Sequence, residues 1–201
     1  MGQDKANLPF CGKPLIQWVL ERALIVADEI IVVANRSDQV QFLDCPIYPD
    51  ELPGSGPLGG LYTALLHAQH PNVGVLACDM PFASPDLLTF QLHLLVDTGV
   101  DVVIPENDKG LEPFHAVYRR ETCLSLVRNA IRAGETRVVG WLPKAHVHYL
   151  KPDEIRSYDP QQLAFHNLNT PEQFRLAEQE FMGVERWSSE VVLRSNQEIT
   201  L

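Results

Sequence analysis

The sequence predicts an α/β domain built on a mostly parallel central sheet. Two apolar runs, EIIVVA at 29–34 and VGVLAC at 73–78, have the length and composition of strands that are buried on both faces. Between and after them lie stretches in which apolar residues recur at helical spacing. Strands that alternate with helices form βαβ units, and right-handed crossovers make their strands parallel.

In the first half of the chain, apolar periodicity after Pro14 predicts a helix, because proline is favoured at the first helical position. The Pro- and Gly-rich stretch 50–60 predicts a loop that leads into the next helix. The expected elements are helices at 15–27, 37–43 and 61–69 and strands at 29–34, 46–49 and 73–78.

In the second half, Ser84 before Pro85 predicts a helix start, with the serine side chain capping free backbone N–H groups. We expect one domain over residues 1–182. Residues 183–201 are expected to be a loosely attached tail, whose strand-like piece at 190–193 either pairs at a sheet edge or stays mobile. The expected elements are helices at 85–96, 121–133, 136–142 and 171–181 and strands at 101–105, 113–119 and 145–150.

The overall composition argues against several function classes. A net charge of -10 and a pI of about 5.1 disfavour nucleic acid or an anionic membrane as the main partner. The four cysteines are widely spaced and form no C-x-x-C, which favours reduced, mostly buried thiols in a cytoplasmic protein. No apolar run reaches transmembrane length, and the polar first ten residues lack the pattern of a signal peptide.

Asp79 ends the apolar run at 73–78 and is followed at once by Met80 and Pro81. Ligands of open parallel sheets bind beyond the carboxyl ends of the strands. A lone carboxylate there suits Mg²⁺, which prefers oxygen ligands and substrate phosphates. The alternative is that Asp79 is a helix cap. The pattern favours the metal role for Asp79 and the capping role for Ser84.

Three further segments suit a phosphate ligand. Lys5 and Lys13 flank a short loop before a helix, and lysine is a mobile cation for phosphate oxygens. The glycines of 50–60 allow close approach of the backbone to a ligand. Asn167 and Asn169, in what reads as a strand end before a helix cap, offer amide oxygens on one side of the chain. Taken singly, each segment is also typical of surface lysines, turns or caps.

Together and in this order, these segments resemble the molybdenum cofactor guanylyltransferase family of nucleotidyltransferases. The resemblance runs from Met1 to about Ala177, and the pieces that carry it are MGQDKA, GKPLI, DELPGSGPLGGL, VLACDMPF, EPFHAVYRR, GETRV and NLNTPE. It implies a Rossmann-like three-layer fold and transfer of GMP from GTP to the terminal phosphate of molybdopterin, with release of pyrophosphate. Mg²⁺ would be the cofactor, GTP and molybdopterin the substrates, and molybdoenzymes or other cofactor-biosynthesis proteins the protein partners.

The resemblance also implies roles for single residues. Lys5 would contact the nucleotide phosphates and act in catalysis together with Asp79, which would hold Mg²⁺. Asn169 would be a weaker ligand of the same metal, and Lys13 would be a second phosphate contact. Asp50 would belong to the guanosine-binding region.

This chemistry needs positioning and charge neutralisation, and no acid–base side chain is obligatory because a phosphate nucleophile is already ionised. The histidines are therefore expected to be structural or to face a substrate; they are His115, His146 and His148. Three arginines are either surface residues or bidentate ligands of the pterin phosphate; they are Arg119, Arg120 and Arg137.

One part of the family pattern is missing at the N-terminal end. The family has a first strand and a Gly-Gly turn before the position of Met1. Its absence would leave neighbouring strands without ladder partners, at about 1–3 kcal/mol for each buried unpaired group. We therefore expect either that Met1 is an internal methionine or that GTP affinity is poor. Two other functions stay open, a CTP-dependent transferase and an inactive nucleotide- or pterin-binding module.

Overall fold

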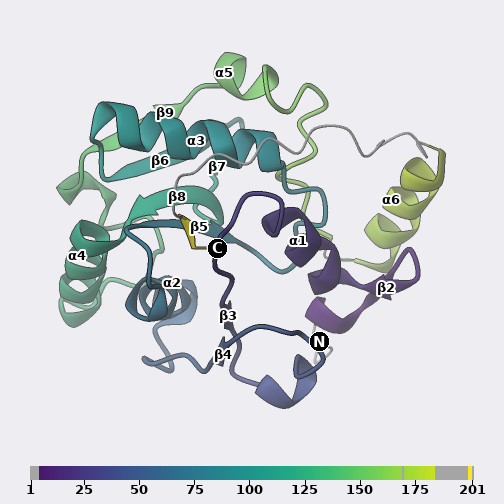
Figure 1. Ribbon diagram of the computed structural model, residues 1–201, viewed down its shortest axis with the longest axis horizontal. Helices are drawn as coiled ribbons and strands as arrows, with labels where there is room; N and C mark the ends of the chain where they lie inside the picture. Colours follow the sequence, from purple (N-terminus) through teal and green to yellow (C-terminus); the bar gives the residue numbers. More distant parts are fainter. Residues whose placement is uncertain (1–4, 169, 184–198, 201) are drawn as a thin grey trace.

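The computed structural model describes residues 5–168, 170–183 and 199–200. A sheet lies between two groups of helices (Figure 1). The strands are β1 (Pro9–Phe10), β2 (Lys13–Pro14), β3 (Val32–Val33), β4 (Ile47–Tyr48), β5 (Asn72–Leu76), β6 (Val102–Asn107), β7 (Gly110–Leu111), β8 (His115–Arg119), β9 (Val147–Leu150) and β10 (Ile199–Thr200). The helices are α1 (Leu15–Ala23), α2 (Gly56–His67), α3 (Pro85–Thr98), α4 (Arg120–Arg132), α5 (Pro152–Arg156) and α6 (Pro171–Gly183), with 3₁₀ turns η1 (Lys5–Asn7), η2 (Ser37–Gln39) and η3 (Leu142–Lys144).

The central sheet has the strand order β10-β5-β8-β6, with β7 and β9 both paired to β6. β8 is antiparallel to β5 and β6, whereas β10 is parallel to β5 and β9 is parallel to β6. All strands of this sheet except β8 and the short β7 therefore run in one direction. The expected mostly parallel α/β architecture is confirmed.

β3 and β4 form a separate parallel pair, and no pairing of described residues joins them to the central sheet. The strand expected at 29–34 is consequently reduced to Val32 and Val33. An apolar run supplies the side chains of a buried strand, but the paired length depends on the partners available on each edge.

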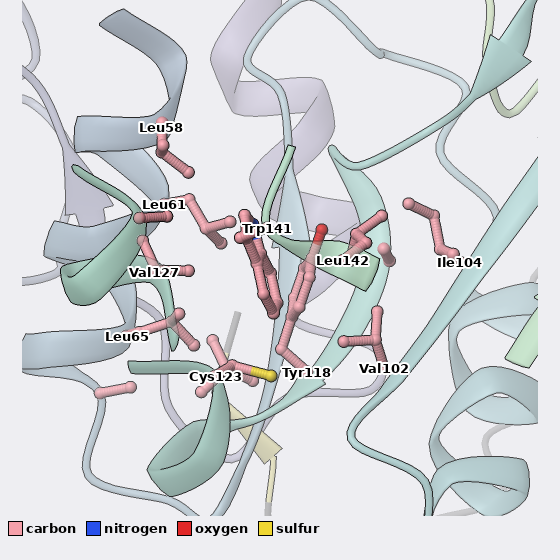
Figure 2. Packing of buried hydrophobic residues seen from close by; sticks show 14 residues of the cluster. Leu58, Leu61, Leu65, Val102, Ile104, Tyr118, Cys123, Val127, Trp141 and Leu142 are labelled. Carbon is pink, nitrogen blue, oxygen red and sulfur yellow. The ribbon is translucent and has the colours of Figure 1, made fainter. Parts of the chain in front are cut away.

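Alternate residues of the central strands face the two helical layers, as the period of two in a strand requires. Along β6, Val102 and Ile104 face the cluster formed with α2 and α4, whereas Val103 faces the cluster formed with α3. In the first cluster Tyr118 packs beside Trp141, with ring centroids 6.2 Å apart (Figure 2). The sheet is thus covered on both faces, which explains why its strands read as continuous apolar runs.

Four expectations about secondary structure are wrong. The helix expected at 37–43 is only the 3₁₀ turn η2 at Ser37–Gln39. The stretch 136–142 is not a helix: the Glu135 carboxylate accepts hydrogen bonds from the backbone N–H groups of Thr136 and Arg137, which holds a turn. α2 begins at Gly56, five residues before the expected start at Leu61. Residues 165–168 form turn and coil instead of a strand end.

Thiol burial also differs from expectation. None of the four cysteines is in a disulfide, but only Cys123 is buried, whereas Cys11 and Cys45 are half-buried and Cys78 is exposed. Burial raises the pKa of the Cys123 thiol far above its usual range. Cys78 lies on the turn that carries Asp79.

Among the described residues, every helix is too short or too polar to cross a membrane.

Two consecutive arginines secure one helix in each layer. Arg119 donates to the carbonyls of Leu95 and Val100 at the end of α3. Arg120 donates to the carbonyls of Leu65 and Leu66 at the end of α2. Cations at helix C-termini pair with carbonyls that have no helical partner. Both side chains therefore have structural roles that the sequence left open.

His115 is a core residue with no exposed surface. Its Nε2 accepts a hydrogen bond from the backbone N–H of Ser84 at 3.1 Å, so the neutral ring carries its proton on Nδ1. Burial lowers the pKa of His115 from 6.5 to about 4. Below about pH 6.5 the His115 imidazole is protonated in the unfolded chain, whereas in the folded chain it stays neutral down to about pH 4. This residue therefore removes about 3 kcal/mol of stability as the pH falls from 6.5 towards 4.

We predict that His115→Gln reduces the loss of unfolding free energy between pH 7 and pH 4.5, because an amide does not titrate but still accepts from the Ser84 N–H. Urea unfolding at several pH values measures this. His146→Gln is the matched control, since the side chain of His146 is 90% exposed. An equal acid sensitivity in the wild type and His115→Gln would contradict the assignment.

Candidate functional site

Three of the four motif segments meet at one aromatic side chain. Phe10, which precedes the Gly12-Lys13 turn, makes edge contacts with Phe82, just after the Asp79 turn, and with Phe174, just after the asparagine segment. The ring centroids lie 5.8 Å and 6.1 Å from that of Phe10. Leu168 belongs to the same apolar cluster. Segments that are far apart in the sequence are thus held together at one edge of the sheet, next to the N-terminus of α1.

Asp79 lies on a turn three residues beyond the end of β5. The backbone N–H of Met80 bonds to the carbonyl of Ala77, which closes the turn. The turn is fixed from two directions: the N–H of Leu168 donates to the Asp79 carbonyl at 3.0 Å, and Arg22 of α1 donates from Nε to the Pro81 carbonyl at 2.6 Å. Met80 is buried and anchors the turn, while Asp79 stays half-buried. The turn that presents Asp79 is therefore rigidly placed.

Asp50 shapes the glycine-rich loop. Its Oδ1 accepts from the N–H of Leu52 at 2.9 Å and lies 3.4 Å from Oγ1 of Thr63, which donates to the Gly59 carbonyl. The Asp50 N–H donates to the Asn35 side chain at 3.0 Å, which ties the ends of β3 and β4 together. The carboxylate therefore acts as a fixed part of the loop framework.

Glycine is required at three positions of this loop, and the first is Gly54, which has a φ of +92°. Gly56 has a φ of +58° at the start of α2, a conformation that side chains disfavour. At Gly59, a Cβ atom would lie 2.9 Å from Oδ1 of Asp50, so only a glycine lets the loop close over the helix. The loop leads into α2, whose first N–H groups have no intrahelical partner, and such a helix N-terminus favours an anion.

The two lysines and two asparagines predicted to bind the ligand differ in their surroundings and in how much of each the structure describes. The Lys13 ammonium is paired with Glu21 and lies 3.5 Å from the centroid of the Trp18 ring, so a phosphate would have to compete with these partners. Lys5 opens η1, and only its backbone is described. Asn169 lies outside the described residues. Asn167, its neighbour two residues earlier, has a buried Oδ1 with no hydrogen-bond partner.

The residues present fit a divalent cation of the magnesium type. The described residues contain no cluster of three or more His, Cys, Asp or Glu that would hold a metal without help. Mg²⁺ does not need one, because it keeps several waters and is bound through one or two carboxylates together with substrate phosphates. Asp79 supplies one carboxylate. Asn167, whose buried Oδ1 has no hydrogen-bond partner, directly precedes Leu168, and the N–H of Leu168 donates to the Asp79 carbonyl.

Several positioning residues were missed from the sequence. Arg22 lies in the last turn of an amphipathic helix, where an arginine is expected on the surface, and nothing local indicates its contact with Pro81. The role of Thr63 could have been predicted, because a hydroxyl in an otherwise apolar stretch of helix needs a hydrogen-bond partner when it is buried. Asn35 directly follows an apolar run, and nothing in the neighbouring sequence indicates its contact with Asp50.

Comparisons with known proteins agree with this geometry. The profile of the MobA-like NTP transferase domain matches residues 1–147. The chain belongs to this family. A probable molybdenum cofactor guanylyltransferase of Pelotomaculum thermopropionicum is 32% identical over 171 residues, which are 85% of this chain and 82% of the relative. A protein of the same description from Methanothermobacter thermautotrophicus is 33% identical over 184 residues, 88% of this chain and 91% of the relative.

Solved structures support the same MobA-like assignment. Molybdopterin-guanine dinucleotide biosynthesis protein A of Archaeoglobus fulgidus has a TM-score of 0.79 at 28% identity, covering 90% of this chain and 92% of that one. 2-C-methyl-D-erythritol 4-phosphate cytidylyltransferase of Thermus thermophilus has a TM-score of 0.67 at 17% identity, covering 89% and 94% of the two chains. The second likeness shows the shared nucleotidyltransferase fold only. The expected three-layer fold is confirmed.

Proposed function

We propose that this MobA-like protein transfers GMP from GTP to the terminal phosphate of molybdopterin, forming the guanine dinucleotide of the cofactor and releasing pyrophosphate. The observation that carries the proposal is the convergence around Phe10 of the lysine turn, the Asp79 turn and the asparagine segment. Relatives that cover most of the chain and are named molybdenum cofactor guanylyltransferase support the substrate pair.

In the proposed reaction, an oxygen of the molybdopterin phosphate attacks the α-phosphorus of GTP. The bond from the α-phosphorus to the bridging oxygen of the β-phosphate breaks, and pyrophosphate leaves with the electron pair. The attacking phosphate is ionised at neutral pH, so no base has to remove a proton. The chain's task is to align the two phosphates and to balance their negative charge.

Within this proposal, individual residues have the following roles. Asp79, helped by an asparagine oxygen from 167 or 169, would hold Mg²⁺, which supplies charge neutralisation at the phosphates when bound. The α2 N-terminus offers N–H donors, and the glycine-rich loop framed by Asp50 surrounds the nucleoside. Lys5 and Lys13 add positive charge. Since the chain carries a net charge of -10, these local cations matter for binding a triphosphate.

We predict pyrophosphate release that depends on both molybdopterin and GTP and that requires a divalent cation. The measurement is a coupled pyrophosphate assay with GTP or CTP, each with and without molybdopterin and with Mg²⁺ or a chelator. Release of pyrophosphate with CTP and molybdopterin, but not with GTP and molybdopterin, would replace this proposal with a cytidylyltransferase. Binding of the pterin by calorimetry, with neither nucleotide bound nor pyrophosphate released, would show instead an inactive binding module.

A further inference from the structure

His115 connects the two segments that are proposed to hold the metal. It is the first residue of β8, which lies between β5 and β6 in the central sheet. Its imidazole is completely buried and contacts one residue from each segment. One contact is with Ser84, at the end of the loop that begins with Asp79. The other is with Phe165, which lies shortly before Asn167.

The contact between His115 and Ser84 is a hydrogen bond. The Ser84 N–H donates to Nε2 of His115 at 3.1 Å. Ser84 directly follows a turn that is closed by the bond from the Ala83 N–H to the Met80 carbonyl. Met80 and Ala83 are both buried, so this turn is packed into the core. The hydrogen bond therefore sets the position of the Asp79 loop relative to β8.

The contact between His115 and Phe165 is an edge-on ring contact. The ring centroids lie 5.4 Å apart at an interplanar angle of 82°. Phe165 is buried and starts a short stretch that ends at Leu168, whose N–H donates to the Asp79 carbonyl at 3.0 Å. Asn167 lies within this stretch, and its buried Oδ1 has no hydrogen-bond partner among the described residues. The same imidazole therefore also sets the position of the asparagine segment.

These contacts form a closed circuit. It runs from Asp79 along its loop to Ser84 and then to the His115 ring. From that ring it passes to Phe165, follows the chain to Leu168 and returns to the Asp79 carbonyl. His115 is the member of the circuit that belongs to neither segment, so removing its ring opens the circuit between them.

A polar ring is unfavourable at this place in the core. Its Nδ1 is buried and has no hydrogen-bond partner in the part of the chain that the structure describes, and such a group lowers stability. Gln91 of α3 donates to the His115 carbonyl at 2.9 Å, so the residue is also fixed through its backbone. An apolar side chain would avoid the unpaired nitrogen, but it could not accept from the Ser84 N–H. The bond to the Asp79 loop thus gives a reason for a histidine here.

We propose that His115 is a positioning residue of the metal site. Its ring holds the Asp79 loop and the asparagine segment at the spacing at which a carboxylate and an amide oxygen can share one divalent cation. Because His115 is completely buried, it acts only through these neighbours. The inference rests on the proposed function, since it takes Asp79 to be a metal ligand. Mutation of residues that orient metal ligands typically lowers metal affinity or activity by about 10- to 100-fold.

Metal binding and hydrogen exchange of the full-length protein test this role. In His115→Leu, which removes the acceptor for Ser84, we expect the dissociation constant of the Mn²⁺–GTP complex, measured by electron paramagnetic resonance, to rise at least about tenfold. Without metal, exchange of the Leu168 amide should also become faster, although both atoms of its hydrogen bond are unchanged. His115→Gln keeps an acceptor and should restore most of both losses.

Val127→Ala is the matched control for lost stability. It removes methyl groups from a fully buried side chain of α4, in the apolar cluster on the other face of the sheet. It should lower the unfolding temperature and leave the Mn²⁺–GTP affinity and the Leu168 exchange rate unchanged. If His115→Leu does not fold, Phe165→Leu opens the same circuit at its ring contact and should produce the same two changes.

Three results would overturn the inference. If Asp79→Ala loses affinity for Mn²⁺–GTP while His115→Leu keeps it together with slow Leu168 exchange, the site does not depend on His115 and only the inference fails. If Asp79→Ala binds Mn²⁺–GTP as tightly as the wild type, the proposed metal role of Asp79 fails together with the inference. If Val127→Ala loses as much affinity as His115→Leu, lost stability explains the effect and no positioning role is left.

Discussion

Asp79→Ala is expected to lower turnover of GTP and molybdopterin by about a thousandfold, because the substitution removes the carboxylate proposed to hold the metal against the phosphates. The fold should persist. The turn around Asp79 is held by its backbone carbonyl, by the Pro81 carbonyl and by buried Met80, none of which the substitution removes. Steady-state kinetics over a range of Mg²⁺ concentrations measures the effect, together with thermal unfolding.

Asp97→Ala is the matched control, because Asp97 is an exposed aspartate at the end of α3. It removes the same charge far along the chain from the turn, and its turnover should equal that of the wild type. Two outcomes would contradict the metal assignment: an unchanged rate for Asp79→Ala, or an equal loss of rate in both variants. A loss of rate that is accompanied by unfolding would instead mean that the Asp79 side chain supports the structure.

The sequence was most informative where chemistry and local backbone pattern coincide. Ser84 was expected to cap a helix, and its Oγ accepts from the Leu87 N–H at the start of α3. The helix cap expected after the asparagine segment is Thr170: its Oγ1 accepts from the N–H of Gln173, and the Gln173 side chain accepts from the N–H of Thr170. Such signals involve neighbours within three residues and need no knowledge of the fold.

Long-range contacts were not predictable in the same way. Arg22 is separated from Pro81 by 59 residues, and its Nε is satisfied only because α1 packs beside the Asp79 turn. Burial lowers the pKa of Arg22, which shows that the guanidinium is partly withdrawn from water. The sequence around Arg22 reads as the polar face of a surface helix. The separation of the β3–β4 pair from the central sheet could not be predicted either, because the length of a strand depends on its pairing partners as well as on the apolar run.

The glycine-rich loop supplies the second large expected effect. In Gly59→Ala, the new methyl carbon would lie 2.9 Å and 3.0 Å from the two Asp50 carboxylate oxygens and 3.1 Å from the Leu52 carbonyl. Because part of this obstruction is backbone, the loop must move. We expect a loss of about 1–3 kcal/mol in unfolding free energy. We also expect a higher KM for GTP with a smaller change in kcat, since the loop is proposed to bind the nucleoside.

Gly60→Ala is the matched control for stability, because a Cβ atom at Gly60 meets nothing within 4 Å. Alanine is the better helix former, so this variant should gain up to about 1 kcal/mol in unfolding free energy. Urea unfolding of both variants separates the local clash from a general effect of adding a methyl group to α2. Equal unfolding free energies of the two variants would mean that the Asp50 carboxylate does not clash with a Cβ atom at position 59. A destabilised Gly59→Ala protein with an unchanged KM for GTP would keep the structural account but remove the nucleoside from this loop.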